Sequence, residues 1–225
     1  MFSAGEMLEP DVTITDFILA VQCLCFAVLI YRKSDNIPWL LLFGSLGIAS
    51  LIGGVVHGFL CDEVSLAYGV LWRFVLVSIG GMALAGWYVG SRFLKNKHAV
   101  GWIRKAAIAQ FFLLNILILF YSQQFLLAAL NYLPAAIFLL VVFLRRYFET
   151  RARAFLFGIA SILLTFVGSF VQIAEISLSP IYFNHNALYH AIQFVAIWLL
   201  FFTARWDIEK EETLKRTAIS PSVTL

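Results

Sequence analysis

The sequence predicts an all-α fold, a polytopic membrane protein built as a bundle of seven transmembrane helices. Two observations carry this prediction. Hydrophobic residues make up 62% of the 225-residue chain and charged residues only 13%, whereas a soluble domain carries about 25% charged residues. The charges also gather in short segments between apolar runs of about 20 residues, the length that crosses a hydrocarbon core of about 30 Å. The net charge of +3 comes from these segments, so it does not indicate a nucleic-acid partner.

The first three spans are separated by polar breaks. The first covers 14–31 and ends at RKSDNIP, and the second covers 39–60 and ends at CDEVS. The third covers 68–91 and ends at the basic segment RFLKNKHAVGWIRK. Spans two and three contain the runs GSLGIASLIGG and SIGGMALAG. Their small residues let neighbouring helices approach closely, so we expect tight packing there.

The remaining four spans follow the same pattern. Span four covers 103–121 and ends at YSQQ, and span five covers 125–144 and ends at RRYFETRAR. Span six covers 154–178 and leads into SLSPIYFNH, and span seven covers 187–204. The chain then closes with WDIEKEETLKRTAISPSVTL, for which we expect a short amphipathic stretch followed by disorder.

Basic residues predict the orientation of the bundle. They flank the loops after spans one, three, five and seven: Arg32, Lys33, Arg92, Lys95, Lys97, Arg104, Lys105, Arg145, Arg146, Arg151, Arg153, Arg205, Lys210, Lys215 and Arg216. The opposite side carries acids instead. The positive-inside rule therefore places the N-terminus outside and the C-terminus in the cytoplasm. We divide the chain into a seven-helix transmembrane domain, 1–206, and a charged cytoplasmic tail, 207–225.

Two histidines from distant segments are expected at the same depth in the membrane. Span two runs from inside to outside, so His57 lies near its outer end. Span seven runs the other way, so Asn186 and His190 lie near its outer start. Asp16 begins span one on that side, and Arg73 lies a little over one turn into span three. Ionisable groups inside a membrane are candidates for function by default.

Helical spacing refines this cluster. Asn186 and His190 are four residues apart, so they share one face of a helix. Gln193, three residues after His190, continues that face. His185 lies five residues before His190 and points away from it in a regular helix. His185 joins the cluster only if the helix begins at Asn186 and His185 lies in the preceding loop.

The clustered histidines predict a metal site with zinc as its cofactor. Neutral imidazoles are good ligands for zinc or iron. His57 and His190, with Asn186 or His185 as a third ligand and a water molecule, would match an open catalytic zinc site. The alternative interpretation is that His57 and His190 hydrogen-bond to neighbouring helices and bind nothing.

Three charged residues on the same side are candidates for catalysis. A zinc site makes a nucleophilic hydroxide near neutral pH, and a nearby carboxylate can move its proton. Asp62 or Glu63 would be this base. Arg73 would stabilise an oxyanion or pair with a carboxylate.

Two segments resemble motifs of the CREST superfamily, which includes the alkaline ceramidases and the progestin and adipoQ receptors. GGVVHGFL resembles the span-two motif, with His57 as its histidine. NALYHAIQFVAIWL resembles the span-seven motif, with His190 at the second position of an HxxxH pair. The resemblance implies seven spans, a zinc ion held by histidines, and hydrolysis of a lipid amide. The outward N-terminus is similar to the ceramidase branch.

The sequence differs from the superfamily pattern at three positions, so we interpret it as a divergent relative. Asn186 stands at the first histidine position of span seven, and Gly53 stands where the superfamily has a serine. The span-three aspartate is missing from YGVLWRFVLV, where Arg73 is the charged residue, and Asp62 comes too early to replace it. His185 would supply a third nitrogen shifted by one residue.

Three functions follow as expectations. The first is a divergent zinc-dependent membrane hydrolase that acts on a lipid amide or ester at the outer membrane face. The second is a non-catalytic seven-helix receptor or lipid-binding protein. The third is a b-type haem protein with His57 and His190 as axial ligands. A retinal photoreceptor is disfavoured, because span seven has no lysine to form the Schiff base.

Overall fold

The computed structural model describes residues 8–60 and 62–219. It contains seven α-helices: α1 (Pro10–Lys33), α2 (Ile37–Phe59), α3 (Leu66–Arg92), α4 (Lys97–Phe120), α5 (Phe125–Thr150), α6 (Arg153–Ile173) and α7 (His185–Ile219). All seven are long and apolar enough to cross a membrane. The described part of the chain has no β-structure except one isolated bridge, between Ser179 and Phe183.

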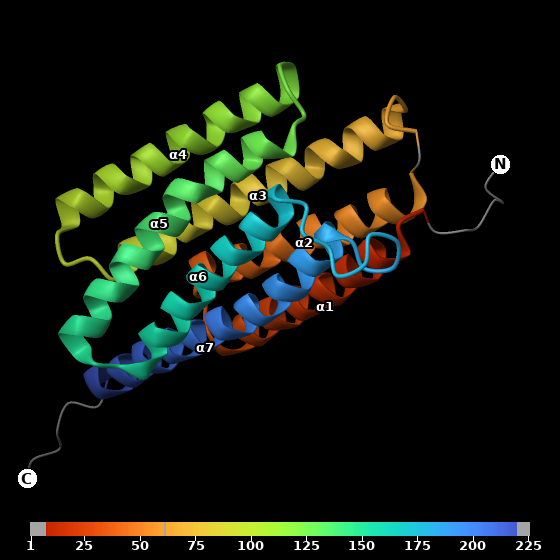
Figure 1. Ribbon diagram of the computed structural model, residues 1–225. Helices are drawn as coiled ribbons and strands as arrows, with labels where there is room; N and C mark the ends of the chain where they lie inside the picture. The colour runs from red at the N-terminus through yellow and green to blue at the C-terminus, as the bar shows by residue number, and fades with distance from the viewer. Residues whose placement is uncertain (1–7, 61, 220–225) are drawn as a thin grey trace, which may run out of the picture.

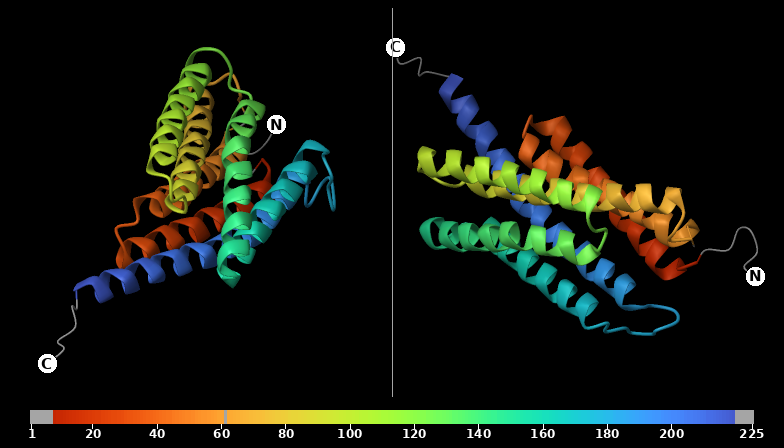
Figure 2. Two further views of the ribbon diagram at one scale, coloured as in Figure 1. Left: turned by 90° about the vertical axis from the view of Figure 1, so that its left-hand side faces the viewer. Right: turned by 90° about the horizontal axis from the view of Figure 1, so that it is seen from above.

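Successive helices run in opposite directions, so α1, α3, α5 and α7 begin at the same end of the bundle (Figure 1). We call this the histidine end and the opposite one the arginine end. Six helices form a closed ring in the order α1, α2, α3, α5, α6, α7, each packed against the next. α4 lies outside the ring, against α3 and α5 (Figure 2). The ring therefore encloses an interior that α4 does not reach.

The seven predicted spans correspond to the seven helices, several of which extend beyond the predicted bounds: α4 begins at Lys97 and α5 ends at Thr150. The connection between α6 and α7 also differs from the prediction. α6 ends at Ile173, earlier than predicted, and Glu175 lies beyond it with a left-handed φ of 52° that a continuing helix cannot adopt. α7 begins at His185. The side chain of Asn184 accepts hydrogen bonds from the backbone N–H groups of Asn186 and Ala187, at 2.9 and 3.1 Å, and so caps the helix.

α7 also continues without a break as far as Ile219, into the region predicted as a charged tail. Two acids of this extension bond back to the bundle. Arg92 of α3 donates from Nε to Asp207 at 3.2 Å and from Nη2 to Glu211 at 2.6 Å. Trp39 of α2 donates from its indole nitrogen to Asp207 at 3.0 Å. These bonds hold the first part of the extension against the ring, while residues 220–225 lie outside the described part of the chain.

Large aromatic side chains pack where α1, α2 and α7 meet. The rings of Phe26 and Phe201 stack with centroids 3.9 Å apart. Phe43 packs edge-on against both, at 5.7 and 6.0 Å. Each such pair contributes about 1 kcal/mol beyond its buried area. These contacts fix how α1, α2 and α7 sit together, and therefore where their polar residues at the histidine end lie.

Candidate functional site

A pocket of about 300 Å³ lies inside the ring of six helices. This volume is at the lower end of the range for small-molecule sites, which are usually concave and mostly apolar. Every ring helix contributes lining residues, and α4 contributes none. The pocket is therefore the interior of the ring, and its chemistry depends on the inward faces of those six helices.

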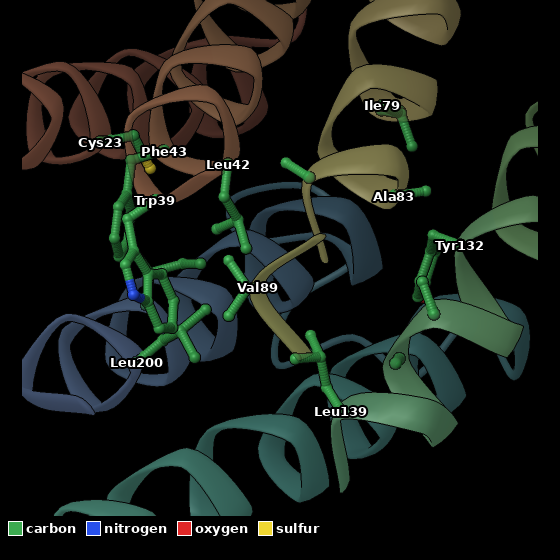
Figure 3. Close-up of a cluster of buried hydrophobic side chains, with 14 of the residues drawn as sticks. Cys23, Trp39, Leu42, Phe43, Ile79, Ala83, Val89, Tyr132, Leu139 and Leu200 are labelled. Atoms are coloured by element: carbon green, nitrogen blue, oxygen red, sulfur yellow. The ribbon is translucent and has the colours of Figure 1, made fainter. Parts of the chain in front are cut away.

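The pocket changes from polar to apolar along its length. Its histidine end is lined by Asp16, His57, Gln172, Asn186 and His190. Further toward the arginine end the lining is aliphatic, and Figure 3 shows several of these side chains: Leu42, Ile79, Ala83, Leu139 and Leu200. On α7 alone, the lining extends from Asn186 to Leu200, a rise of about 21 Å along the helix.

His190 connects α7 to α1. The hydroxyl of Thr15 lies 2.9 Å from the backbone oxygen of Asp11 and 3.0 Å from that of Val12. The Nδ1 atom of His190 lies 3.3 Å from this hydroxyl oxygen. In one neutral tautomer Nδ1 carries the proton and donates to Thr15, and in the other Nε2 carries it and Nδ1 accepts from the hydroxyl.

The other ring nitrogen of His190 faces a carboxyl group. His190 Nε2 lies 3.5 Å from Oδ1 of Asp16, longer than the roughly 2.7–2.9 Å that is typical of a charge-assisted hydrogen bond. Both side chains are largely buried, with 12% of His190 and 5% of Asp16 exposed. A buried carboxylate needs a proton donor or a cation beside it, which the Nε2–H tautomer of His190 or a bound ligand can supply.

Gly53 makes room for the Asp16 carboxylate. A Cβ atom built on Gly53 would lie 3.0 Å from Oδ2 of Asp16, which is too close for the carboxylate to stay where it is. Gly53 is the position at which the resemblance implies a serine, and the carboxylate of Asp16 packs directly against it. Asp16 takes up the space that a side chain at Gly53 would need.

His57 is held by an acid of its own. Its Nδ1 atom lies 2.5 Å from Oε2 of Glu9, the residue before α1. The backbone N–H of Leu8 bonds to the oxygen of Gly58 at 3.2 Å, which ties the start of the described chain to the end of α2. The contact with Glu9 leaves Nε2 as the ring nitrogen of His57 that is available to a ligand.

Two pairs of polar side chains cross between α6 and α7. Gln172 donates to the amide oxygen of Asn186 at 3.2 Å. Thr165 donates to the amide oxygen of Gln193 at 3.3 Å. Asn186 and Gln193 share the inward face of α7 with His190, as their spacing predicts. The amide oxygen of Asn186 is the atom that would bind a metal ion, and it already accepts this hydrogen bond from Gln172.

The structure brings His57, His190 and Asn186 to one pocket but leaves the other predicted site residues outside its lining. Asp62 and Glu63 are exposed in the α2–α3 connection, where Asp62 accepts from the backbone of Val64. Arg73 donates to the backbone oxygen of Gly69 in its own helix. His185 is the first residue of α7 and does not line the pocket, and Cys61 lies outside the described residues.

No group of three or more His, Cys, Asp or Glu side chains is close enough together to hold a metal ion among the described residues. Two donors do have a suitable separation. The edge of a zinc tetrahedron with bonds of about 2.0–2.1 Å is about 3.4 Å long, close to the 3.5 Å between His190 Nε2 and Asp16 Oδ1. His57 lines the same pocket but would have to move to complete the set.

Asp16 is the residue of the pocket whose approach to His190 sequence reasoning missed. Its position at the outer start of span one was clear, but its approach to His190 was not. A carboxylate on the inward face of a span is a signal in itself, because ionisable groups in spans face the bundle interior or a cavity. The glycine opposite it, Gly53, adds a second signal only after α1 and α2 are placed side by side.

Comparison with known proteins gives one match. No curated protein and no solved structure matches the chain. A family model described as "Family of unknown function (DUF6962)" matches residues 12–207, which include the whole pocket lining. The chain belongs to this family.

Proposed function

We propose that this protein binds one amphipathic lipid inside its helix bundle, with the polar group of the lipid at Asp16 and His190. The observation that carries the proposal is the change from polar to aliphatic lining within one pocket of about 300 Å³. An acyl chain matches the aliphatic part, since it needs no hydrogen bonds. The pocket volume favours a lipid with one chain inside the ring.

The polar end also restricts the chemistry of the ligand. Asp16 Oδ1 lies 3.5 Å from His190 Nε2, and an ionised Asp16 only accepts hydrogen bonds. A ligand group that satisfies this carboxylate must donate hydrogen bonds or carry positive charge. Amide N–H, hydroxyl and ammonium groups meet this condition, whereas an ester carbonyl or a free carboxylate does not. The preferred ligand is therefore a lipid amide, alcohol or amine.

Filling the aliphatic part of the pocket tests the binding proposal. Ala83 of α3 and Ala136 of α5 both line it and are almost fully buried. We expect Ala83→Leu and Ala136→Leu, made separately, each to reduce bound lipid about tenfold in native mass spectrometry, because the added methyl groups occupy the path of the chain.

The matched control is Ala109→Leu, the same substitution on an exposed position of α4, outside the ring. It should leave lipid occupancy unchanged. Thermal unfolding in the same detergent separates a filled pocket from a misfolded protein. Equal occupancy in all four proteins, or a wild-type protein that carries no lipid, would refute the proposal.

Metal-dependent hydrolysis of a lipid amide or ester is the second candidate function. It is favoured by two features: His190 and Asp16 have the separation of zinc ligands, and His57 Nδ1 bonds to Glu9. A carboxylate on the far nitrogen is the usual support of a metal-binding histidine. A bound zinc ion would supply Lewis-acid activation of water, with His57, His190 and Asp16 as its protein ligands.

Zinc analysis tests this candidate. The purified wild-type protein should contain about one zinc per chain and lose it on His190→Ala, since three protein ligands are needed for a catalytic site. Less than about a tenth of an equivalent in the wild type, after zinc is supplied, would contradict it. A zinc-free protein that still binds lipid would leave the first proposal intact and remove the second.

We also propose that the chain is a multi-pass integral membrane protein with the histidine end outside and the arginine end in the cytoplasm. Support comes from the seven apolar helices and from the basic residues at the arginine end. A reporter active only in the cytoplasm should be active when fused after residue 225. Activity of an exported reporter at that position would reverse the orientation.

A further inference from the structure

A second pocket, of about 320 Å³, lies at the arginine end between α3, α5 and α7. We call it the basic pocket. Four of its lining residues are basic and two are acidic: Arg92, Lys95, Arg146, Lys210, Asp207 and Glu211. It is separate from the pocket inside the ring and shares no lining residue with it.

The two acids of the basic pocket already have partners. Arg92 bonds to both Asp207 and Glu211. Glu211 also pairs with Lys215 at 3.0 Å and accepts from the amide of Asn36 at 3.2 Å. Asp207 and Glu211 are therefore matched by Arg92 and Lys215 and do not neutralise the other bases around the pocket.

Three basic side chains are left with unused capacity. Neither Lys95 nor Lys210 forms an ion pair with a carboxylate within residues 8–60 and 62–219. Arg146 bonds to Glu149 through Nη1, and Glu149 is shared with Arg145. The Nε atom of Arg146 is buried and has no hydrogen-bond partner. The basic pocket thus offers donors and positive charge to an anion.

We propose that the basic pocket binds a phosphate group, carried either by an anionic lipid headgroup or by a soluble phosphorylated molecule. Arginine binds phosphate oxygens through its planar fork and lysine binds them as a point charge. Basic pockets between helices at the predicted cytoplasmic end are suited to anionic headgroups. The indole of Trp206 lies 4.9 Å from Lys210 Nζ and holds that ammonium group at the pocket.

Binding to the full-length protein in detergent tests the assignment. The probes are dioctanoyl phosphatidic acid, dioctanoyl phosphatidylcholine and glycerol 3-phosphate. The test variant is Lys95→Ala/Lys210→Ala. Its matched control is Lys97→Ala/Lys105→Ala, which removes the same charge at the same end, outside the pocket. Lys105 lies over Trp102 at 5.6 Å, much as Lys210 lies over Trp206.

We expect the test variant to bind phosphatidic acid about tenfold or more weakly, because each lysine near a phosphate contributes attraction. The control variant should bind as the wild type does. Competition by glycerol 3-phosphate would identify a soluble ligand, and its failure to compete would identify a lipid headgroup. Equal affinity in both double variants, or equal affinity for phosphatidylcholine and phosphatidic acid, would overturn the assignment.

Discussion

Carboxylates at the two ends of the bundle face different partners. At the arginine end, Asp207 accepts from Arg92 and Trp39, and Glu211 accepts from Arg92. At the histidine end, Asp16 is 4% exposed and faces the imidazole of His190. No lysine or arginine pairs with Asp16 in the described chain. The carboxylates at the arginine end are paired with a cation, whereas Asp16 at the histidine end has no lysine or arginine partner among the described residues.

The difference separates a structural site from a binding site. A buried ion pair with all its hydrogen bonds holds helices in register, and removal of one partner is strongly destabilising. A buried acid without a cation costs stability, which supports the binding role that we propose for Asp16. Arg92 belongs to the scaffold that positions α7, while Asp16 and His190 line the pocket in which we propose that a ligand binds.

The largest expected effect on stability comes from breaking the paired site. Arg92→Met should lower the free energy of unfolding by about 2–3 kcal/mol, since it leaves Asp207 and Glu211 without their shared cation. This figure is reduced from that of a fully buried pair because 24% of Arg92 is exposed. Thermal unfolding measures it. Arg205→Met, which removes a half-exposed pair with Glu209, should cause no measurable change.

Removal of the charge of Asp16 should have the opposite effect on stability. Asp16→Asn should raise the free energy of unfolding by about 1 kcal/mol, because it removes an uncompensated buried charge. The same variant should weaken lipid binding about tenfold, as it replaces a charged acceptor by a neutral amide. If Asp16→Asn lowered stability as much as Arg92→Met does, Asp16 would stabilise the fold, and the contrast between the two ends would be wrong.

A smaller effect should follow from crowding Asp16 without changing its charge. Gly53→Ala puts a methyl group 3.0 Å from the present position of Asp16 Oδ2. The carboxylate must then shift by a few tenths of an ångström relative to His190, and we expect lipid binding to weaken about threefold. In an Asp16→Ala background the same change should have no effect, because nothing is left to displace. Additive losses would argue against this coupling.

The smallest effect is expected at the edge of the pocket. Glu9→Gln keeps a hydrogen-bond acceptor for His57 but removes the charge, and 44% of the Glu9 side chain is exposed. We expect stability to stay within about 0.5 kcal/mol of the wild type, as for other exposed ion pairs. Lipid binding should fall by no more than about twofold, since His57 remains in the pocket lining. If Glu9→Gln weakened lipid binding as much as Asp16→Asn does, the polar group of the lipid would bind at His57 and not at Asp16.

The sequence predicted the seven helices and the gathering of His57, Asn186 and His190 at one end of the bundle. Length and hydropathy set seven spans, and the alternation of direction brought His57 and His190 to one end. Helical spacing placed Asn186 and Gln193 on the face of His190, as found. These features depend on periodicity and direction within single segments, which a sequence records directly.

Contacts between segments were harder to predict. The approach of Asp16 to His190 depends on which helix lies beside α7, and nothing in the α1 segment records that. The charged segment after span seven was expected to be a short amphipathic stretch followed by disorder, and its contacts with the bundle were not foreseen: Asp207 and Glu211 find a partner in Arg92 more than a hundred residues earlier. Asp62 and Glu63 lie at the histidine end, but they are exposed in the α2–α3 connection and do not line the pocket.

An experimental density map of the wild-type protein in a lipid nanodisc tests the central claim most directly. The account predicts elongated density inside the ring of six helices, with its polar end within hydrogen-bond distance of Asp16 and His190. The other end should reach the layer of Leu42, Leu139 and Leu200. A pocket closed by side chains, or lipid density whose polar end lies away from Asp16, would contradict it.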